Sequence, residues 1–200
     1  MESGTRETRG DEVMPEFYLD IETYSPVKPI DFNKDPIISV AYQQIDGKTG
    51  KELGPLTILK SWESSEKEML TKFYNIFNVA NRWAFIPIGY KLADFDFVMM
   101  GTHFRKYGLN ISATTLYNHP YIDLYPVALL CNGGEFKGCS LQALAGKQGS
   151  GASISDWYTK KDYSAIEFYI KDEAKSFINL YSYFVKNMPV MFQGFKGGTK

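Results

Sequence analysis

An apolar run near the start of the chain, FYLDIET at residues 17–23, carries two carboxylates, Asp20 and Glu22. Its residue types predict a strand in a core, and side chains alternate along a strand, so Asp20 and Glu22 point to the same face. Two like charges side by side repel, and removing them from water costs on the order of several kcal/mol. A metal ion would offset that cost, and so would plain exposure on an edge strand. The segment therefore predicts one of these two arrangements, and the rest of the chain must decide between them.

The size of the chain bounds its architecture. Its 200 residues predict one domain over 14–190, between a disordered arm at 1–13 and a flexible tail at 191–200. The net charge of −1 provides no global field that would attract nucleic acid. Any polyanion must therefore be held locally, by metal ions or by a small basic cluster.

Cysteine spacing and apolar run lengths exclude two classes of protein. Cys131 and Cys139 form no CxxC pair, and His119 stands alone upstream of them, so neither a disulfide framework nor a zinc site is predicted. A reducing, cytoplasmic setting fits best. No stretch of about 18 apolar residues is present, so no membrane-spanning helix is expected, and the N-terminal segment lacks an apolar signal core.

Strand patterns come first along the chain and then alternate with helical patterns, which predicts an α/β layered fold with a mixed sheet. Strands are expected over 16–23, 37–45 and 54–60 as an antiparallel meander, and over 82–90. Residues 120–130 are expected to begin as a strand and continue as a helix. Helices are expected over 61–80 with Ser64 or Ser65 as N-cap, over 95–107, near 140–146 and over 163–186.

Several carboxylates interrupt otherwise apolar local patterns. They are Asp20, Glu22, Asp96, Asp123 and one of Asp172 or Glu173. Oxygen-only ligands suit hard cations such as Mg²⁺ or Mn²⁺. Two such ions can clamp the attacking and leaving oxygens of an in-line phosphoryl displacement, which takes about four carboxylates from different elements.

Several of these carboxylates lie in segments that resemble a known family. FYLDIET resembles the first motif of the DEDD superfamily of 3′–5′ exonucleases, and IGYKLADFD at 88–96 resembles the second. PYIDLYP and SLQALAG resemble the segments that follow in exonucleases related to the proofreading domain of family-B DNA polymerases. The resemblance covers about residues 16–186. It implies a ribonuclease H-like fold, with a mixed sheet of about five or six strands flanked by helices.

The third motif of this tyrosine-containing branch is a Tyr, three residues and an Asp on a helix, and two registers compete for it. One pairs Phe168 with Asp172, and the other pairs Tyr169 with Glu173. At about 100° per residue, one apolar stripe takes in Ile166, Ile170, Phe177, Tyr181 and Phe184. Tyr169 and Glu173 lie on or beside this stripe, whereas Asp172 lies near the lysines. We therefore favour Glu173 and keep Asp172 as the alternative.

The resemblance also implies roles for the matching residues. Asp20, Glu22, Asp96 and Glu173 would hold two Mg²⁺ or Mn²⁺ ions. Tyr169 would orient the attacking water, since neither histidine of the chain lies in the final helix. The residues expected to contact the substrate are Thr23, Tyr90, Lys91, Phe95 and Asp123.

Some of these assignments have structural alternatives. Lys91 stands where the family commonly has Asn, and it could contact a phosphate, compete with a metal or point to solvent. Asp123 could instead cap the helical segment after it, and Tyr90 and Phe95 could be packing residues. Within GKQGSGASISDWYTKK, the aromatics beside Lys147, Lys160 and Lys161 could hold a single strand, or the segment could be a solvated loop with an aromatic anchor.

The sequence therefore favours a metal-dependent 3′–5′ exonuclease that works by a two-metal-ion mechanism. Its expected substrate is the 3′ end of single-stranded DNA or RNA, with DNA favoured. A second hypothesis is a binding module that grips nucleic-acid ends on the same fold without cutting them. A third is endonucleolytic cutting on that fold.

Overall fold

A five-stranded mixed sheet forms the centre of the protein. The structure is a computed structural model that describes residues 15–79, 81–111, 116, 118–146 and 151–197, with side chains described as far as residue 190. Its strands are β1 (Glu16–Thr23), β2 (Ile37–Ile45), β3 (Thr57–Lys60), β4 (Ile86–Gly89) and β5 (Ile122–Asp123). They lie in the order β3-β2-β1-β4-β5, in which β2 runs antiparallel to both neighbours while β1, β4 and β5 are parallel. The predicted α/β fold with a mixed sheet is confirmed. The arm predicted at 1–13 lies outside the described residues.

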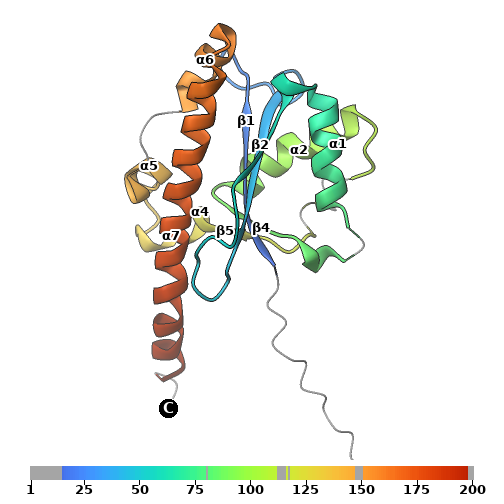
Figure 1. Ribbon diagram of the computed structural model, residues 1–200. Helices are drawn as coiled ribbons and strands as arrows, with labels where there is room; N and C mark the ends of the chain where they lie inside the picture. Colours follow the sequence, from blue (N-terminus) through green and yellow to red (C-terminus); the bar gives the residue numbers. More distant parts are fainter. Residues whose placement is uncertain (1–14, 80, 112–115, 117, 147–150, 198–200) are drawn as a thin grey trace, which may run out of the picture.

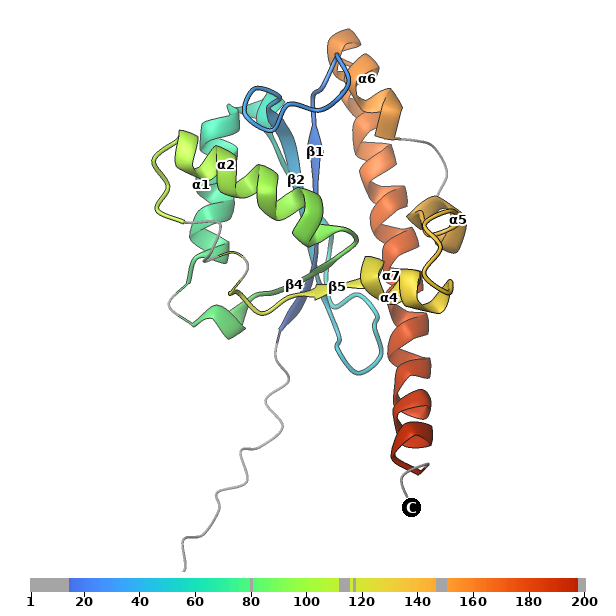
Figure 2. The same cartoon turned by 180° about the vertical axis from the view of Figure 1, so that it is seen from behind.

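Helices cover both faces of this sheet. The α-helices are α1 (Glu66–Phe77), α2 (Phe97–Lys106), α4 (Leu124–Cys131), α5 (Leu141–Ala145), α6 (Ile154–Lys160) and α7 (Tyr163–Gly197). Short turns of other helical types are η1 (Ser61–Glu63), η2 (Arg82–Ala84), the π-helical η3 (Leu92–Asp96) and η4 (Gly151–Ser153). Figures 1 and 2 show α1 and α2 on one face of the sheet, and α7 with α4, α5 and α6 on the other.

Strand β1 divides the apolar interior into two cores. Leu19 and Ile21 pack in the core beneath α1 and α2, whereas Tyr18 packs in the core beneath α7. This alternation is the one that the sequence predicts, and it places Asp20 and Glu22 on the α7 side. Strand β1 pairs with β2 along its length and with β4 over Glu16–Tyr18, so β1 is a central strand of the sheet. Asp20 and Glu22 lie beyond the part that pairs with β4, and both are partly buried rather than exposed.

Several element boundaries differ from the prediction. Strand β3 begins at Thr57 rather than at residue 54, and the strand expected over 82–90 is preceded by the turn η2. The helix expected over 61–80 is divided into η1 and α1, because the Ser65 hydroxyl accepts a hydrogen bond from the Glu68 amide at 3.1 Å and starts a new helix there. The helix expected from residue 95 starts earlier, as a π turn from Leu92.

The C-terminal third holds the two largest departures. The Gly/Ser segment interpreted as a loop contains α6, whose Ile154 is buried in the core beneath α7. The last helix was expected to end near residue 186, but α7 continues through Pro189 to Gly197, past the start of the predicted tail. Figure 1 shows α7 running the length of the sheet and beyond it.

A partly buried carboxylate, that of Glu66, links elements around the first core. Glu66, at the start of α1, accepts a hydrogen bond from the Ile37 amide at 2.7 Å and another from the Tyr107 hydroxyl at 2.6 Å. The Nδ1 atom of the fully buried His103 lies 2.6 Å from the same carboxylate. Burial alone would raise the pKa of Glu66, but the hydrogen bonds from its partners outweigh burial and lower the pKa to about 2.

Because the pKa of Glu66 is lower in the folded chain than in the unfolded one, Glu66 stabilises the fold fully above its ordinary pKa of 4.5. That stability is lost as the pH falls towards about 2. The free energy of unfolding, measured by urea denaturation, should fall between about pH 5 and pH 3. We expect this fall to be smaller by about 2 kcal/mol in Glu66→Gln than in wild type. Glu68→Gln, at an exposed acid of the same helix, is the control and should leave most of the decrease in place. An equal pH dependence in wild type and Glu66→Gln would contradict the expectation.

Candidate metal centre

Three carboxylates from two distant segments meet on the α7 side of the sheet. Asp20 and Glu22 come from β1 and Glu173 from α7, and one oxygen of each lies within 4.8 Å of the others. All three side chains are partly buried, so their negative charges are only partly screened by water. The β1–β2 register shifts between Glu22 and Thr23, directly after the second acid. An oxygen-only set of this kind fits a hard divalent cation such as Mg²⁺ or Mn²⁺, whose charge would offset the repulsion.

Asp96 approaches the same strand from the other direction. It ends the π turn η3, and its Oδ1 accepts a hydrogen bond from the Ile21 amide at 3.1 Å, between the two acids of β1. Its side chain is buried, and the burial raises its pKa well above the ordinary range. The Ile21 hydrogen bond opposes this rise, whereas the charge of Glu173 adds to it. Asp96 therefore lies beside the acidic group but outside the three residues whose oxygens approach within 4.8 Å.

Tyr169 lies one helical turn before Glu173 on α7. Its side chain is only 4% exposed, and its hydroxyl is hydrogen-bonded to Glu173. Burial raises the pKa of this phenol, and the charges of Glu22, Glu173 and Asp20 raise it further. The phenol therefore stays protonated at neutral pH and can donate a hydrogen bond beside the acids.

The two registers of the third motif are separated by the structure of α7. Phe168, the partner of Asp172 in the first register, is 73% exposed and points away from the core. Asp172 is partly buried but is not part of the acidic group, which contains Glu173. The structure thus places the Tyr169–Glu173 pair beside β1.

Sequence reasoning treated Tyr18 only as part of an apolar run. Its side chain is fully buried, and its pKa is raised first by burial and then by Asp20, Glu173 and Glu22 in that order. The Tyr18 hydroxyl is therefore buried on the same side of β1 as the three acids, within reach of their charges. The available signal was its position two residues before Asp20, which puts the two side chains on one face.

Asp123 and Lys91 meet at the end of β5. The Oδ1 atom of Asp123 accepts hydrogen bonds from the Lys91 amide at 2.9 Å and the Tyr125 amide at 3.0 Å, and its Oδ2 accepts one from the Ala93 amide at 3.2 Å. Asp123 is the N-cap of α4 and also braces the start of η3. Both oxygens are engaged by the backbone, which supports the capping interpretation rather than direct contact with a substrate.

Lys91 has a left-handed backbone, with φ 66° and ψ 26°, a conformation that Gly and Asn adopt more readily than Lys. Its ammonium lies 4.5 Å from the centre of the Tyr125 ring, so it makes a cation–π contact. The Lys91 ammonium is thus held over the Tyr125 ring, and we expect that it does not compete for a cation at the acidic group.

We expect Lys91→Gly to be more stable than Lys91→Ala by about 1 kcal/mol, because both lose the ammonium but only Ala strains the left-handed backbone. The measurement is the free energy of unfolding of both variants. Mn²⁺ affinity should stay within about twofold of wild type in both. A rise of tenfold or more in either variant would show that the Lys91 ammonium does compete with the metal.

The other residues predicted to contact a substrate are Thr23, Tyr90 and Phe95. Thr23 is the last residue of β1 and is partly buried. The Tyr90 hydroxyl donates a hydrogen bond to the Cys139 carbonyl oxygen, and the Phe95 ring packs edge-to-face on Phe32 at 5.8 Å. Both aromatics are thus held by packing within the chain.

The aromatics predicted to hold a single strand lie on α6. Trp157 lies 6.1 Å from Tyr169 between ring centres, and Tyr158 lies 5.0 Å from Tyr24. They pack against aromatic side chains of the domain, which favours the anchor interpretation. Lys160 and Lys161 are exposed at the end of α6, and Lys147 lies outside the described residues.

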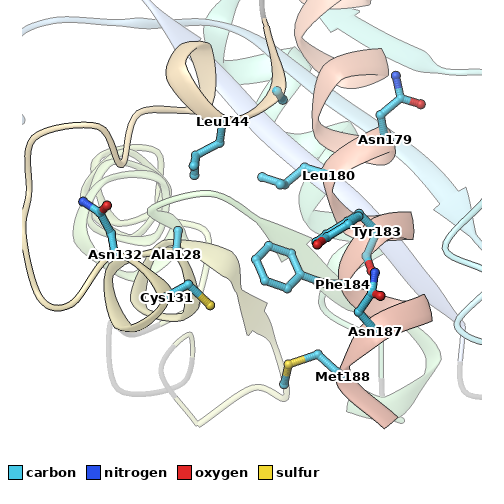
Figure 3. A pocket seen from close by; sticks show the side chains of 11 residues that line it. Ala128, Cys131, Asn132, Leu144, Asn179, Leu180, Tyr183, Phe184, Asn187 and Met188 are labelled. Carbon is cyan, nitrogen blue, oxygen red and sulfur yellow. The ribbon is translucent and has the colours of Figure 1, made fainter. Parts of the chain in front are cut away.

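A separate pocket of about 620 Å³ lies between α4, α5 and the middle of α7. Figure 3 shows Leu144, Leu180 and Phe184 pointing into it, with Asn132 and Asn187 at its sides. None of the described residues that line it is charged. It therefore provides no cation for a phosphate and no carboxylate for a metal, and it is distinct from the acidic group.

No protein-family model matches the sequence, and no curated protein matches it either. Solved structures do match. The family B DNA polymerase from the hyperthermophilic archaeon Pyrobaculum calidifontis is similar with a TM-score of 0.64 and 15% identity, over 88% of this chain and 25% of that chain. E. coli exonuclease I in complex with a dT13 oligonucleotide is similar with a TM-score of 0.62 and 14% identity, over 90% of this chain and 42% of that chain.

The zinc-ion-bound form of the E. coli exonuclease I complex with single-stranded DNA gives the same TM-score of 0.62, 14% identity and coverage of 90% and 42%. This chain thus spans less than half of the length of each of these proteins. At such identities the likeness shows the fold, and it agrees with the expected ribonuclease H-like architecture. Among the described residues, no helix combines the length and apolar character needed to cross a membrane.

Proposed function

We propose that this chain is a metal-dependent 3′–5′ exonuclease of the tyrosine branch of the DEDD superfamily, which releases mononucleotides from the 3′ end of single-stranded nucleic acid. The observation that carries the proposal is the convergence of Asp20, Glu22 and Glu173, with Tyr169 hydrogen-bonded to the last of them. Acids from opposite ends of the sequence gather here although their charges repel. That arrangement is costly unless a cation binds there.

In this proposal the protein groups have separate tasks. Asp20, Glu22 and Glu173 hold the ions, and Asp96 is the fourth carboxylate. Bound there, two Mg²⁺ or Mn²⁺ ions would neutralise the charge that develops on the phosphate and lower the pKa of the attacking water. The protonated Tyr169 phenol orients that water by a hydrogen bond, since burial and the surrounding charges keep its proton in place.

The preference for DNA is supported by the structural neighbours. E. coli exonuclease I has been solved with a dT13 oligonucleotide and with single-stranded DNA, and the other neighbour is a DNA polymerase. The chain has no global positive charge, so we infer that the metal ions provide much of the local attraction for the scissile phosphate.

The test is a nuclease assay on 5′-labelled single-stranded DNA and on RNA of the same sequence, with Mn²⁺ and then with excess EDTA. The proposal predicts a ladder of single-nucleotide steps that EDTA abolishes, faster on DNA. Internal fragments would instead indicate endonucleolytic cutting. Binding without any EDTA-sensitive shortening would support the end-binding module and contradict the proposal.

A further inference from the structure

The turn η4 and helix α6 join the two elements that carry the acidic group. The Ser155 hydroxyl oxygen accepts a hydrogen bond from the Ser25 amide at 3.0 Å, and the Thr159 and Tyr24 hydroxyls lie 3.3 Å apart. These contacts fix the segment to the chain that leaves β1, two and three residues after Glu22. On its other side, α6 packs on α7, and its Ile154 is buried in the same core as Tyr169. The position of η4 is therefore set from both β1 and α7.

Gly151, the first residue of η4, lies against the Tyr169 hydroxyl. A Cβ atom built at Gly151 would lie 3.2 Å from that oxygen, tighter than an ordinary carbon–oxygen contact. The backbone of Gly151 does not require a glycine, because its φ lies outside the left-handed region. The close approach to Tyr169 is therefore the structural reason for a glycine at this position.

Tyr169 has little freedom to move away from an added methyl group. Its side chain is only 4% exposed, its hydroxyl is hydrogen-bonded to Glu173, and its ring lies 6.1 Å from that of Trp157. A side chain at position 151 would therefore displace the hydroxyl relative to Glu173 or push η4 away from it.

We propose that Gly151 is a positioning residue for the Tyr169 hydroxyl: because it presents no side chain, the η4 turn closes against the phenol and fixes it beside Glu173. The consequence for catalysis rests on the proposed function, since it requires that Tyr169 orient the attacking water. Gly151 itself makes no contact with the ions or the scissile bond in this account.

The catalytic arm of the test measures kcat and KM for 3′-end removal from single-stranded DNA. We expect Gly151→Ala to lower kcat about tenfold with KM within twofold, because small displacements of an orienting group are costly. Gly54→Ala is the matched control, since a Cβ there meets nothing within 4 Å and its backbone is not left-handed. In a Tyr169→Phe background, which lacks the hydroxyl, Gly151→Ala should change kcat less than twofold.

The thermal arm tests the contact without any need for activity. Gly151→Ala should lower the melting temperature by about 2 °C in wild type and leave it unchanged in Tyr169→Phe. Equal shifts in both backgrounds would overturn the proposal even if the chain is an active exonuclease. The shifts could instead differ between the two backgrounds while the wild-type protein shows no nuclease activity. That result would support the positioning of Tyr169 by Gly151 and would overturn the proposed function.

Discussion

Asp20→Asn is expected to lower the rate of 3′-end removal about a thousandfold, while the metal-free protein stays at least as stable as wild type. Asp20 lies on the central strand β1 and forms one acidic group with Glu22 and Glu173. Replacing its carboxylate by an amide removes both a metal ligand and a negative charge, so the rate falls. The rate is measured on 5′-labelled single-stranded DNA with saturating Mn²⁺. The free energy of unfolding is measured in EDTA.

The stability half of this prediction follows from Coulomb's law. Like charges whose oxygens lie within 4.8 Å repel by about 0.9 kcal/mol per pair in bulk water, and by more where the protein excludes solvent. Asp20→Asn removes two such pairs at almost constant volume, so we expect about 1 to 3 kcal/mol of added stability in EDTA.

The matched control is Asp94→Asn, at an exposed acid of the neighbouring turn η3, which should change neither quantity. A large loss of stability in Asp20→Asn without metal would indicate that Asp20 is a structural residue. Retained activity would remove it from the catalytic centre.

The second large prediction compares two variants at neighbouring acids of α7, Glu173→Gln and Asp172→Asn. Glu173 reaches the acids of β1, whereas Asp172 lies about 100° further round α7 and is not in the group. We expect Glu173→Gln to lower the rate of shortening at least about a hundredfold, and Asp172→Asn to stay within about threefold of wild type. Both rates are measured at saturating Mn²⁺ on the same labelled DNA.

The pair is its own control, since each variant removes one negative charge from the same turn of α7. A reversed order of effects would assign the third motif to the Phe168–Asp172 register. Equal, small effects would mean that α7 provides no ligand, and the proposed two-ion site would then lack its third motif.

Local patterns carry much of this architecture. The alternation along β1 predicts that Asp20 and Glu22 share a face, and the structure puts them on the α7 side. The apolar stripe of the last helix likewise predicts which of its two acids turns inward, and Glu173 is the one that the structure brings to β1. Both arguments work because burial of one face fixes the orientation of a strand or a helix.

Contacts between distant segments are what the sequence did not reveal. The Gly- and Ser-rich composition around α6 predicts a loop. In the structure, Ile154 is buried in the core beneath α7, and the Ser155 hydroxyl accepts a hydrogen bond from the Ser25 amide. The left-handed backbone of Lys91 was equally hidden, since a Lys gives no local signal for it. Gly151 and Tyr169 lie on either side of α6 in the sequence, and no local sequence pattern predicts that they approach each other.

The position of Asp96 shows a further limit of motif reasoning. The spacing placed it among the acids, but its Oδ1 is bound to the Ile21 amide, and the structure leaves it outside the group of three. A motif records which residue types recur together. It does not record how close their oxygens lie, and the assignment of Asp96 as the fourth metal ligand stays a prediction.

The most direct test of the account is a crystal structure of the chain soaked with Mn²⁺ and a deoxynucleoside monophosphate, with anomalous differences measured near the manganese edge. The account predicts anomalous peaks ligated by Asp20, Glu22 and Glu173, with the nucleotide phosphate on the same ions and Tyr169 facing it. Peaks at Asp172 instead, or no peak between β1 and α7 at millimolar Mn²⁺, would contradict the claim that these acids gather to hold divalent cations.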